Sequence, residues 1–242
     1  MSDTPAAPQF TPERRRPEAE EIELAVVYED EWLIAIDKPP GMVVHPTYKN
    51  WSGTLLNALL WRVRGREGVV PSIITRLDKQ TSGLVLVALS PIVHAQVQRD
   101  AVAGRVKKEY LAIVEGAPSP LTDTIQLPLA RSAEDRRRVV VTDSGQPCET
   151  RYEVLSTTGA QSVVRCELVT GRTHQIRVHL AARGWPIAGD VVYGEAHPVL
   201  TRQALHAWRL SVTHPVTRQL LEIEAAVPLD LQQIMSDQNF TL

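Results

Sequence analysis

Short apolar runs separated by turn residues dominate the chain from about residue 21 onward. The runs 24–28 and 32–37 flank the acidic turn 29–31, a pattern that predicts two strands joined by a tight turn. The run 83–89 is apolar throughout, which is typical of a strand covered on both faces. We expect further strands at 106–115, 149–156, 162–169, 205–212 and 220–227.

Three segments favour helices instead, and they lie at 54–63, 91–103 and 173–183. The second begins with Ser90 and Pro91, a favoured N-cap and a favoured first helical residue. Gly184 marks the end of the third. Because strands are many, helices are few and a regular βαβ repeat is absent, we expect an α/β (α+β) fold with a mixed, mostly antiparallel sheet and flanking helices.

The beginning of the chain differs from the rest. Residues 1–20 are rich in proline, alanine and charge, with almost nothing to bury, so we expect a disordered tail. Residues 21–242 are then expected to form a single domain. Within it, the segment 117–147 is rich in proline and charge, and we expect it to leave the sheet in a long excursion that could contain a hairpin.

Composition limits the class of protein. The 242 residues are 43% hydrophobic and 22% charged, which is ordinary for a soluble globular protein. No stretch approaches the roughly 18 apolar residues of a membrane span, and the first residues lack the apolar segment of a secretory signal. Two cysteines are too few for a disulfide scaffold or a cysteine-rich zinc site, so we expect a reducing, cytoplasmic setting.

The net charge of −2 hides an asymmetry, because residues 1–31 carry −6 and the remainder carries +4. A mildly basic body permits a nucleic-acid partner without requiring one. Arginine supplies most of the basic residues, and its guanidinium can grip phosphate with two hydrogen bonds and stack on bases. The alternative is a solvated, arginine-rich surface with no such partner.

One candidate for chemistry is the polar segment 75–83, which directly precedes the buried strand. Asp78 lies there between the cations Arg76 and Lys79. Nearby positive charge favours the ionised carboxylate, which suits a nucleophile or a charge stabiliser rather than a proton-donating acid. The alternative is a loop aspartate that accepts hydrogen bonds within a turn.

A second candidate is the segment 171–179, which places Arg172, His174, Arg177 and His179 close together. A glycine, a threonine cap and a helix start form a turn whose free N–H groups suit an anion. A metal site is not expected, because the two histidines are five residues apart and do not share a helix face. A phosphate-cradling glycine loop and a serine–histidine–aspartate order are also absent from the sequence.

Five segments between residues 24 and 229 carry a family resemblance: YEDEWLIAIDKPPGMVVHP at 28–46, RLDKQTSGLVLVALS at 76–90, KKEYLAIVEG at 107–116, GRTHQIRVHLAARGWPIAGDVVYG at 171–194 and LHAWRLSVTHP at 205–215. In this order they resemble the RluA-type RNA pseudouridine synthases, whose signature is HRLDxxTSG. Thr75 departs from the signature by replacing its histidine. Many members also carry an N-terminal S4 module, and the residues before the first expected strand are too few for one.

The resemblance implies a pseudouridine synthase fold with a central cleft, and an isomerase that converts uridines of structured ribosomal or transfer RNA to pseudouridine. It implies a flipped-out nucleotide, no cofactor, no metal and a monomer. Asp78 would be the catalytic carboxylate, either attacking or deprotonating the sugar, and Arg177 would be its ion-pair partner. Tyr110 would stack on the uracil and is a candidate to remove the C5 proton, although its usual pKa of about 10 requires help from the site.

The resemblance also implies residues that hold the substrate. Arg76 would fill the gap left by the flipped nucleotide, and Ile176 would pack against the base. The other expected substrate-binding residues are Arg172, His174 and Gln175. Candidates for phosphate contact, each of which could equally be a solvated surface charge, are Arg62, Arg64, Arg66, Arg136, Arg137 and Arg138.

Two other functions stay open. A non-catalytic RNA-binding or ribosome-assembly protein could use the same fold, although pure binding has no use for a buried carboxylate. A hydrolase that cleaves the N-glycosidic bond would release the free base. Tritium release from C5-labelled RNA and detection of free uracil would separate these functions from isomerisation.

Overall fold

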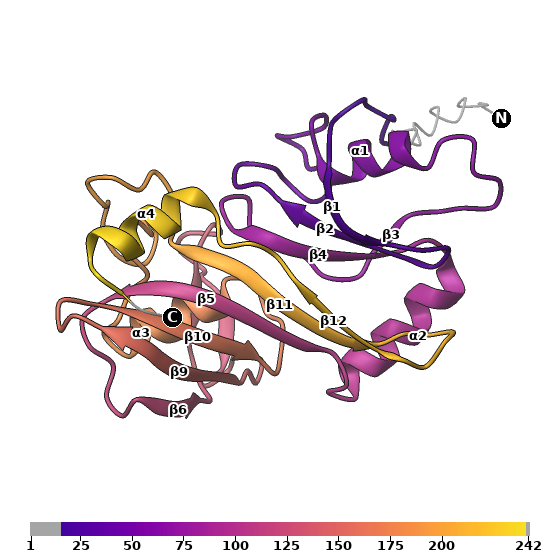
Figure 1. Ribbon diagram of the computed structural model, residues 1–242. Coiled ribbons are helices and arrows are strands. Elements are labelled where there is room, and N and C mark those ends of the chain that lie inside the picture. The colour runs from indigo at the N-terminus through magenta and orange to yellow at the C-terminus, as the bar shows by residue number, and fades with distance from the viewer. Residues whose placement is uncertain (1–15, 241–242) are drawn as a thin grey trace, which may run out of the picture.

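Within residues 16–240, which the computed structural model describes, ten strands form one mixed sheet (Figure 1). All neighbouring strands are antiparallel except one parallel pair, which confirms the expected sheet type. The main path runs through β1 (Ala25–Glu29), β2 (Leu33–Lys38), β4 (Ser82–Ala88), β11 (Leu205–Thr213), β5 (Lys107–Glu115), β10 (Gln161–Leu168), β9 (Thr150–Thr157) and β6 (Thr122–Ile125). Beside it, β3 (Ser72–Ile73) pairs with β4, and β12 (Leu220–Glu224) pairs with β11.

Two helices cover opposite faces of β4, namely α1 (Leu55–Arg62) and α2 (Pro91–Val102). Val85 and Val87 of β4 belong to the apolar cluster that includes α1, whereas Leu84 and Leu86 belong to the cluster that includes α2. Every residue of β4 is therefore buried, as its apolar run predicted. Ser90 caps α2 by accepting a hydrogen bond from the amide of Val93, as expected for that residue.

The other half of the sheet is covered by α3 (Gln175–Ala182) and α4 (Leu229–Asp237). Ile176 and Leu180 of α3 share one apolar cluster with Leu231 and Ile234 of α4 and with the inner face of β5. No helix was expected at α4. Its buried positions are nevertheless Leu231, Ile234 and Met235, which is the i, i+3, i+4 spacing of an amphipathic helix.

The segment 117–147 first contributes the edge strand β6 to the main sheet, and it then leaves the sheet and forms a hairpin. Its strands β7 (Leu129–Arg131) and β8 (Val139–Val141) pair antiparallel in a separate two-stranded sheet. Leu129 and Val139 pack against Val178 of α3, so the hairpin lies directly on the helix. The other expected strands are confirmed with shifts of a few residues at their ends.

The prediction that residues 1–20 are disordered is wrong for the last of these residues, which contact α1. The backbone carbonyl of Glu18 accepts a hydrogen bond from the Asn57 side chain at 2.7 Å. The amide of Glu20 donates to the Asn57 carbonyl at 3.0 Å, and its carboxylate accepts from the amide of Gly53 at 2.8 Å. The physical reason is that free polar groups near the start of α1 offer partners to this acidic segment. Residues 1–15 of the expected tail lie outside the described residues.

The two halves of the sheet meet at the parallel pairing of β4 with β11, which we call the seam (residues 82–83 with 206–207). The hydroxyl of Ser82 lies 3.0 Å from Nδ1 of His206 across it. Gly83 has a φ of 108°, and a Cβ at this position would lie 2.2 Å from the carbonyl oxygen of Ala207. The seam therefore requires glycine, both for its backbone conformation and for the close approach of the strands.

Replacing Gly83 by alanine tests this requirement. We expect Gly83→Ala to lower the free energy of unfolding by about 3 kcal/mol or more, because strain at positive φ adds to overpacking against backbone. Gly159→Ala is the matched control, since Gly159 also has a positive φ of 86° but has open space around it. Urea denaturation should show a loss of only about 1 kcal/mol for the control. Equal losses in the two variants would mean that the close approach at the seam is not required.

Candidate active site

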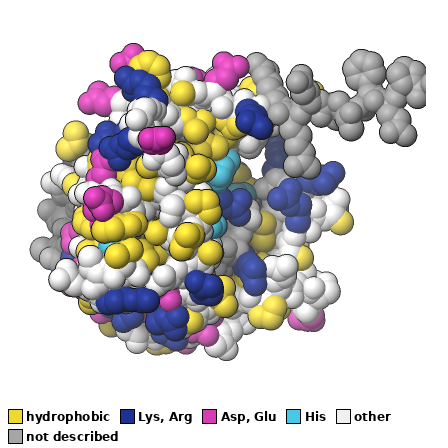
Figure 2. Space-filling model, turned by 90° about the vertical axis from the view of Figure 1, so that its right-hand side faces the viewer, with side chains coloured by type: hydrophobic (Ala, Val, Ile, Leu, Met, Phe, Trp, Pro, Cys, Tyr) yellow, Lys and Arg dark blue, Asp and Glu magenta, His cyan; other side chains and the backbone are white. Residues whose placement is uncertain are grey.

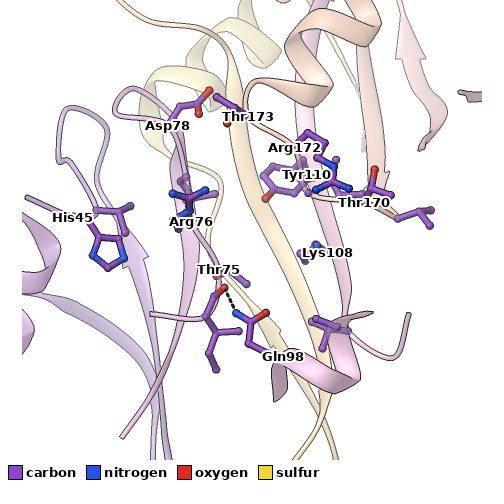
Figure 3. Close-up of a pocket in the computed structure, with 18 of the residues that line it drawn as sticks. His45, Thr75, Arg76, Asp78, Gln98, Lys108, Tyr110, Thr170, Arg172 and Thr173 are labelled. Carbon is purple, nitrogen blue, oxygen red and sulfur yellow. Dashed lines mark hydrogen bonds between the residues drawn. The ribbon is translucent and has the colours of Figure 1, made fainter. Parts of the chain in front are cut away.

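A cavity of about 720 Å³ opens beside the seam (Figure 3). One wall is the loop 74–78 before β4, and the facing wall is formed by β5 and the loop 168–173. Residues from the loop 43–47 and from the C-terminal end of α2 complete the lining. Cavities of roughly 300–1,000 Å³ are usual for small-molecule sites, so this one has room for a nucleotide.

Two carboxylates from different parts of the chain share one guanidinium at this cavity. Nη1 of Arg177, on α3, donates to Oδ2 of Asp78 at 2.8 Å. Nε and Nη2 of Arg177 donate to the two oxygens of Asp190 at 2.6 and 2.8 Å. Asp190 and Arg177 are buried, with 1% and 6% of their side chains exposed, whereas 26% of the Asp78 side chain is exposed. We call this arrangement the Asp–Arg–Asp chain.

The two carboxylates stabilise the charged form of Arg177. Burial opposes the charged form of Arg177, but the hydrogen bonds and charges of Asp190 and Asp78 raise its pKa above the usual value. Within the described residues, only Oδ2 of Asp78 accepts a side-chain hydrogen bond, and Oδ1 accepts none. Asp78 thus has one carboxylate oxygen held by Arg177 and the other without a hydrogen-bond partner among the described residues.

Tyr110 lies on β5 in the wall of the cavity opposite the loop that carries Asp78 (Figure 3). Its side chain is buried and belongs to the same apolar cluster as Ile176. Burial raises the pKa of Tyr110, and the negative charge of Asp78 raises it further. The phenol is therefore protonated at neutral pH, and the site does not lower its pKa as the sequence analysis required of a base.

His174 lies close to Asp78, with Nε2 at 3.7 Å from Oδ2. Nδ1 of His174 is 2.7 Å from the hydroxyl of Tyr193, which accepts a hydrogen bond from the amide of Val139. The Tyr193 hydroxyl can therefore donate its proton to Nδ1 of His174. Neutral His174 then carries its own proton on Nε2, which faces Asp78. Burial lowers the pKa of His174 and keeps it neutral, although Asp78 acts in the opposite direction.

The expected threonine cap at this helix is wrong. α3 begins after His174, whose φ is 55° and whose side chain makes no capping hydrogen bond. A left-handed residue reverses the chain at that position, so His174 rather than Thr173 directly precedes the helix. The side chain of His174 is instead committed to Tyr193.

Comparison with known proteins identifies the family. The RNA pseudouridylate synthase family matches residues 32–182, a range that includes Asp78, Tyr110 and Arg177. The chain belongs to this family. RNA pseudouridine synthases are isomerases, so membership confirms the expected class of enzyme.

Relatives from several bacteria support the assignment. The ribosomal large subunit pseudouridine synthase D of Nitrosomonas europaea is 42% identical over 228 residues, which cover 90% of this chain and 66% of that protein. The protein of the same name from Zymomonas mobilis is 39% identical, with 89% and 73% covered. An uncharacterized RNA pseudouridine synthase of Bacillus subtilis is 39% identical, with 90% and 74% covered. The chain thus spans about two thirds to three quarters of the length of these relatives.

Solved structures of the family have the same fold. Human RNA pseudouridylate synthase domain containing 4 aligns with a TM-score of 0.74 at 24% identity, covering 90% of this chain and 94% of that chain. Human RNA pseudouridylate synthase domain containing 1 aligns with a TM-score of 0.70 at 25% identity, covering 94% and 98%. These alignments confirm the pseudouridine synthase fold that the five sequence segments implied.

Among the expected substrate-binding residues of this synthase, Arg76 and Arg172 line opposite walls of the cavity (Figure 3). Gln175 does not face the cavity. Its Oε1 accepts hydrogen bonds from the Thr170 hydroxyl and the Arg172 amide, and its Nε2 donates to the Glu149 carbonyl. Because these bonds tie the loop 170–172 to α3, Gln175 shapes the wall instead of contacting a ligand.

The expected phosphate-contact residues fall into two groups. Arg62 and Arg66 both pair with Glu29, and the Arg64 guanidinium lies over the Trp61 ring, so the structure does not bring this group to the cavity. The second group lies in the loop between β7 and β8. The Arg138 guanidinium lies 5.5 Å from the centre of the Tyr193 ring, whereas Arg136 has no side-chain partner within residues 16–240. Arg137 is held by Asp135.

The sequence analysis did not single out three residues that organise the site: Lys38, Asp190 and Tyr193. Lys38 is fully buried, and its ammonium donates to the carbonyls of Pro39, Met42 and Lys79. It thereby joins the turn after β2 to the loop that carries Asp78. Burial, reinforced by the charge of Arg202, lowers the pKa of Lys38 to about 8. A lysine in an apolar strand just before a Pro-Pro-Gly turn was the available signal.

Thr75, which replaces the histidine of the family signature, has a structural role. Its hydroxyl accepts a hydrogen bond from the amide of Leu86 at 2.9 Å and ties the loop to β4. Between residues 16 and 240, no group of three or more His, Cys, Asp and Glu side chains could hold a metal ion. In the same range, no helix has the length and apolar composition that crossing a bilayer requires.

Removing Asp190 tests whether the buried half of the Asp–Arg–Asp chain stabilises the protein. We expect Asp190→Ala to cost about 3–5 kcal/mol of unfolding free energy, because it leaves Arg177 buried with one carboxylate fewer. Glu224→Ala is the control, since Glu224 also accepts a hydrogen bond from an arginine, Arg209, but the two side chains are 53% and 44% exposed. There we expect about 1 kcal/mol or less, because water hydrates the exposed guanidinium once the carboxylate is removed. Urea denaturation measures both, and a smaller loss for Asp190→Ala would contradict the assignment.

Proposed function

We propose that this chain isomerises specific uridines of large-subunit ribosomal RNA to pseudouridine in the cytoplasm. The observation that carries the proposal is the carboxylate of Asp78, which has one oxygen bound by buried Arg177 and the other without a hydrogen-bond partner among the described residues. This carboxylate faces a cavity, and Tyr110 lies on the opposite wall. The ribosomal substrate is proposed because two relatives are named ribosomal large subunit pseudouridine synthase D.

The reaction rearranges one nucleoside without any net oxidation. The bond between N1 of uracil and C1′ of ribose breaks, the base turns, a bond forms between C5 and C1′, and the C5 proton leaves as N1 gains one. A carboxylate with an unshared oxygen can either attack C1′ or take a proton from the sugar. In both routes Arg177 positions the carboxylate of Asp78 through the hydrogen bond to Oδ2.

Tyr110 is proposed to stack on the uracil and to accept the C5 proton late in the reaction. Attack turns Asp78 into a neutral ester, and deprotonation turns it into a neutral acid. Either route removes the negative charge that raises the pKa of Tyr110. The phenolate therefore becomes more accessible after the glycosidic bond has broken, which is when C5 must lose its proton.

The uridine must leave its RNA helix to reach this site, because C1′ and the base cannot both be handled inside a stack. Extrusion costs a few kcal/mol, and least where the base is unpaired. Arg76, exposed at the rim of the cavity, is proposed to occupy the gap left in the RNA. Arg138 at the β7–β8 hairpin is proposed to contact phosphate.

Replacing Asp78 tests the proposed catalytic carboxylate. We expect Asp78→Asn to fold and bind RNA but to release no tritium from RNA labelled at C5 of uridine, since an amide neither attacks nor deprotonates the sugar. Asp143→Asn, at an exposed aspartate outside the cavity, should retain the wild-type rate. Pseudouridine mapping in a strain carrying Asp78→Asn should show loss from ribosomal RNA. Loss from transfer RNA alone would overturn the ribosomal substrate, and full turnover by Asp78→Ala would overturn the role of Asp78.

Replacing Tyr110 tests the proposed proton acceptor. We expect Tyr110→Phe to keep its melting temperature within a few degrees while its single-turnover rate falls about 100-fold or more. Because the pKa of Tyr110 is raised, the phenolate fraction increases about tenfold per pH unit between pH 6 and 9. The wild-type single-turnover rate should therefore rise with pH, and that of Tyr110→Phe should not. A variant with the wild-type rate would remove Tyr110 from proton transfer.

A further inference from the structure

Lys108 occupies a place in the cavity to which neither the family resemblance nor the catalytic residues assign a role. It lies on β5 two residues before Tyr110, so the two side chains point to the same face of the strand, with Cα atoms about 7 Å apart. Both line the cavity on the same wall (Figure 3). The neighbouring residues Lys107 and Glu109 point to the other face, where Glu109 pairs with Arg165.

Lys108 carries a charge that the protein does not balance. Within residues 16–240, its ammonium takes part in no ion pair or side-chain hydrogen bond, although the side chain is half-buried. Burial lowers the pKa of Lys108, and no carboxylate counteracts this effect. Asp78 is the single acidic residue in the lining of the cavity as the described residues form it. An unpaired, half-buried ammonium is unfavourable unless a ligand supplies the missing negative charge.

The surroundings of Lys108 suit an anion. A Cβ on Gly171 would lie 3.5 Å from Nζ of Lys108, so the ammonium lies beside the loop that carries Arg172. Arg76 faces it from the other wall (Figure 3). On the face in Figure 2, Lys and Arg side chains border a hollow, and most acidic side chains lie away from it.

We propose that Lys108 binds the RNA phosphate adjacent to the flipped uridine. This rests on the proposed function, which puts the uracil on Tyr110 and the ribose at Asp78. The phosphate next to that ribose is then within reach of Lys108, which lies two residues from Tyr110 on the same face of β5. The phosphate is the group of a nucleotide that carries a full negative charge. A compact ammonium suits such a point contact.

The cavity also gives the RNA strand a direction. Beyond Lys108 it continues past Val106 to Gln98 and Val102 at the C-terminal end of α2. Val102 is 90% exposed, although it is apolar. When the phosphate next to the flipped uridine is bound to Lys108, the RNA backbone beyond that phosphate therefore continues along β5 toward the C-terminal end of α2.

Salt-dependent binding tests the proposal. The probe is a large-subunit ribosomal RNA transcript without modified nucleotides, and the variants are Lys108→Gln, Lys108→Arg and the matched control Lys107→Gln on the opposite face of the same strand. We expect Lys108→Gln to bind several-fold more weakly at about 0.1 M salt, and its plot of log K against log salt to flatten by about 0.7–1, the value for one lost phosphate contact. Lys108→Arg and Lys107→Gln should keep the wild-type slope.

Single-turnover rates at saturating RNA separate phosphate binding from contact with the base. We expect Lys108→Gln to retain the wild-type rate within about threefold, since the lost contact affects binding. An unchanged salt slope would overturn the phosphate assignment, whether or not the single-turnover rate at saturating RNA is also lost. If Lys108→Gln does not fold, a flattened slope for Lys108→Arg would also overturn it. Failure of the wild type to form pseudouridine would overturn the proposed function instead, whatever the slopes.

Discussion

One guanidinium, that of Arg177, holds together the parts of the chain on which the chemistry depends. Asp78 comes from the loop before β4, in one half of the sheet, whereas Arg177 and Asp190 follow β10, in the other half. The halves meet at a parallel pairing of only two residue pairs. A buried arginine shared by two carboxylates links them a second time, at the cavity. Because Asp190 already accepts from two nitrogens of Arg177, Asp78 is held by the third nitrogen through one oxygen only.

The loop that carries Asp78 is held by buried donors that bond to its backbone and to one of its hydroxyls. Lys38 donates to the carbonyl of Lys79, and Arg202 donates to the carbonyl of Gln80. The side chain of Gln203 donates to the Thr81 hydroxyl. Burying cations is unfavourable unless their protons find acceptors. The loop backbone supplies one acceptor to each of these two cations, and the other acceptors are carbonyls of neighbouring segments and the Asp230 carboxylate. The loop is thereby fixed before any ligand arrives, which is the condition for an active site whose charges do not reorganise during the reaction.

Local sequence pattern was sufficient to predict most of the strands and helices, and to single out Asp78 as a candidate for chemistry. The apolar run of β4, the Ser90 cap of α2 and the placement of Asp78 between cations are properties of neighbouring residues, so the sequence displays them. Asp190 and Tyr193 act through partners at least 13 residues away, and no local pattern encodes those contacts. The left-handed conformation of His174 and the ordering of residue 20 also depend on distant neighbours. The roles of Asp78, Tyr110 and Arg177 came from the family resemblance rather than from pattern.

Charge balance explains how an ionised carboxylate and a polyanion can share one cavity. The Asp–Arg–Asp chain keeps a net charge of −1 beside the position proposed for the ribose, and this charge repels the phosphates that flank it. Arg76, Lys108 and Arg172 surround the same cavity, and Asp78 is the single acidic lining residue among those described. These cations offset the repulsion without touching Oδ1 of Asp78, which must stay free. In the proposed function two tasks are thus separated, since the cations that line the cavity would attract RNA while buried Arg177 holds one oxygen of Asp78 and leaves the other free.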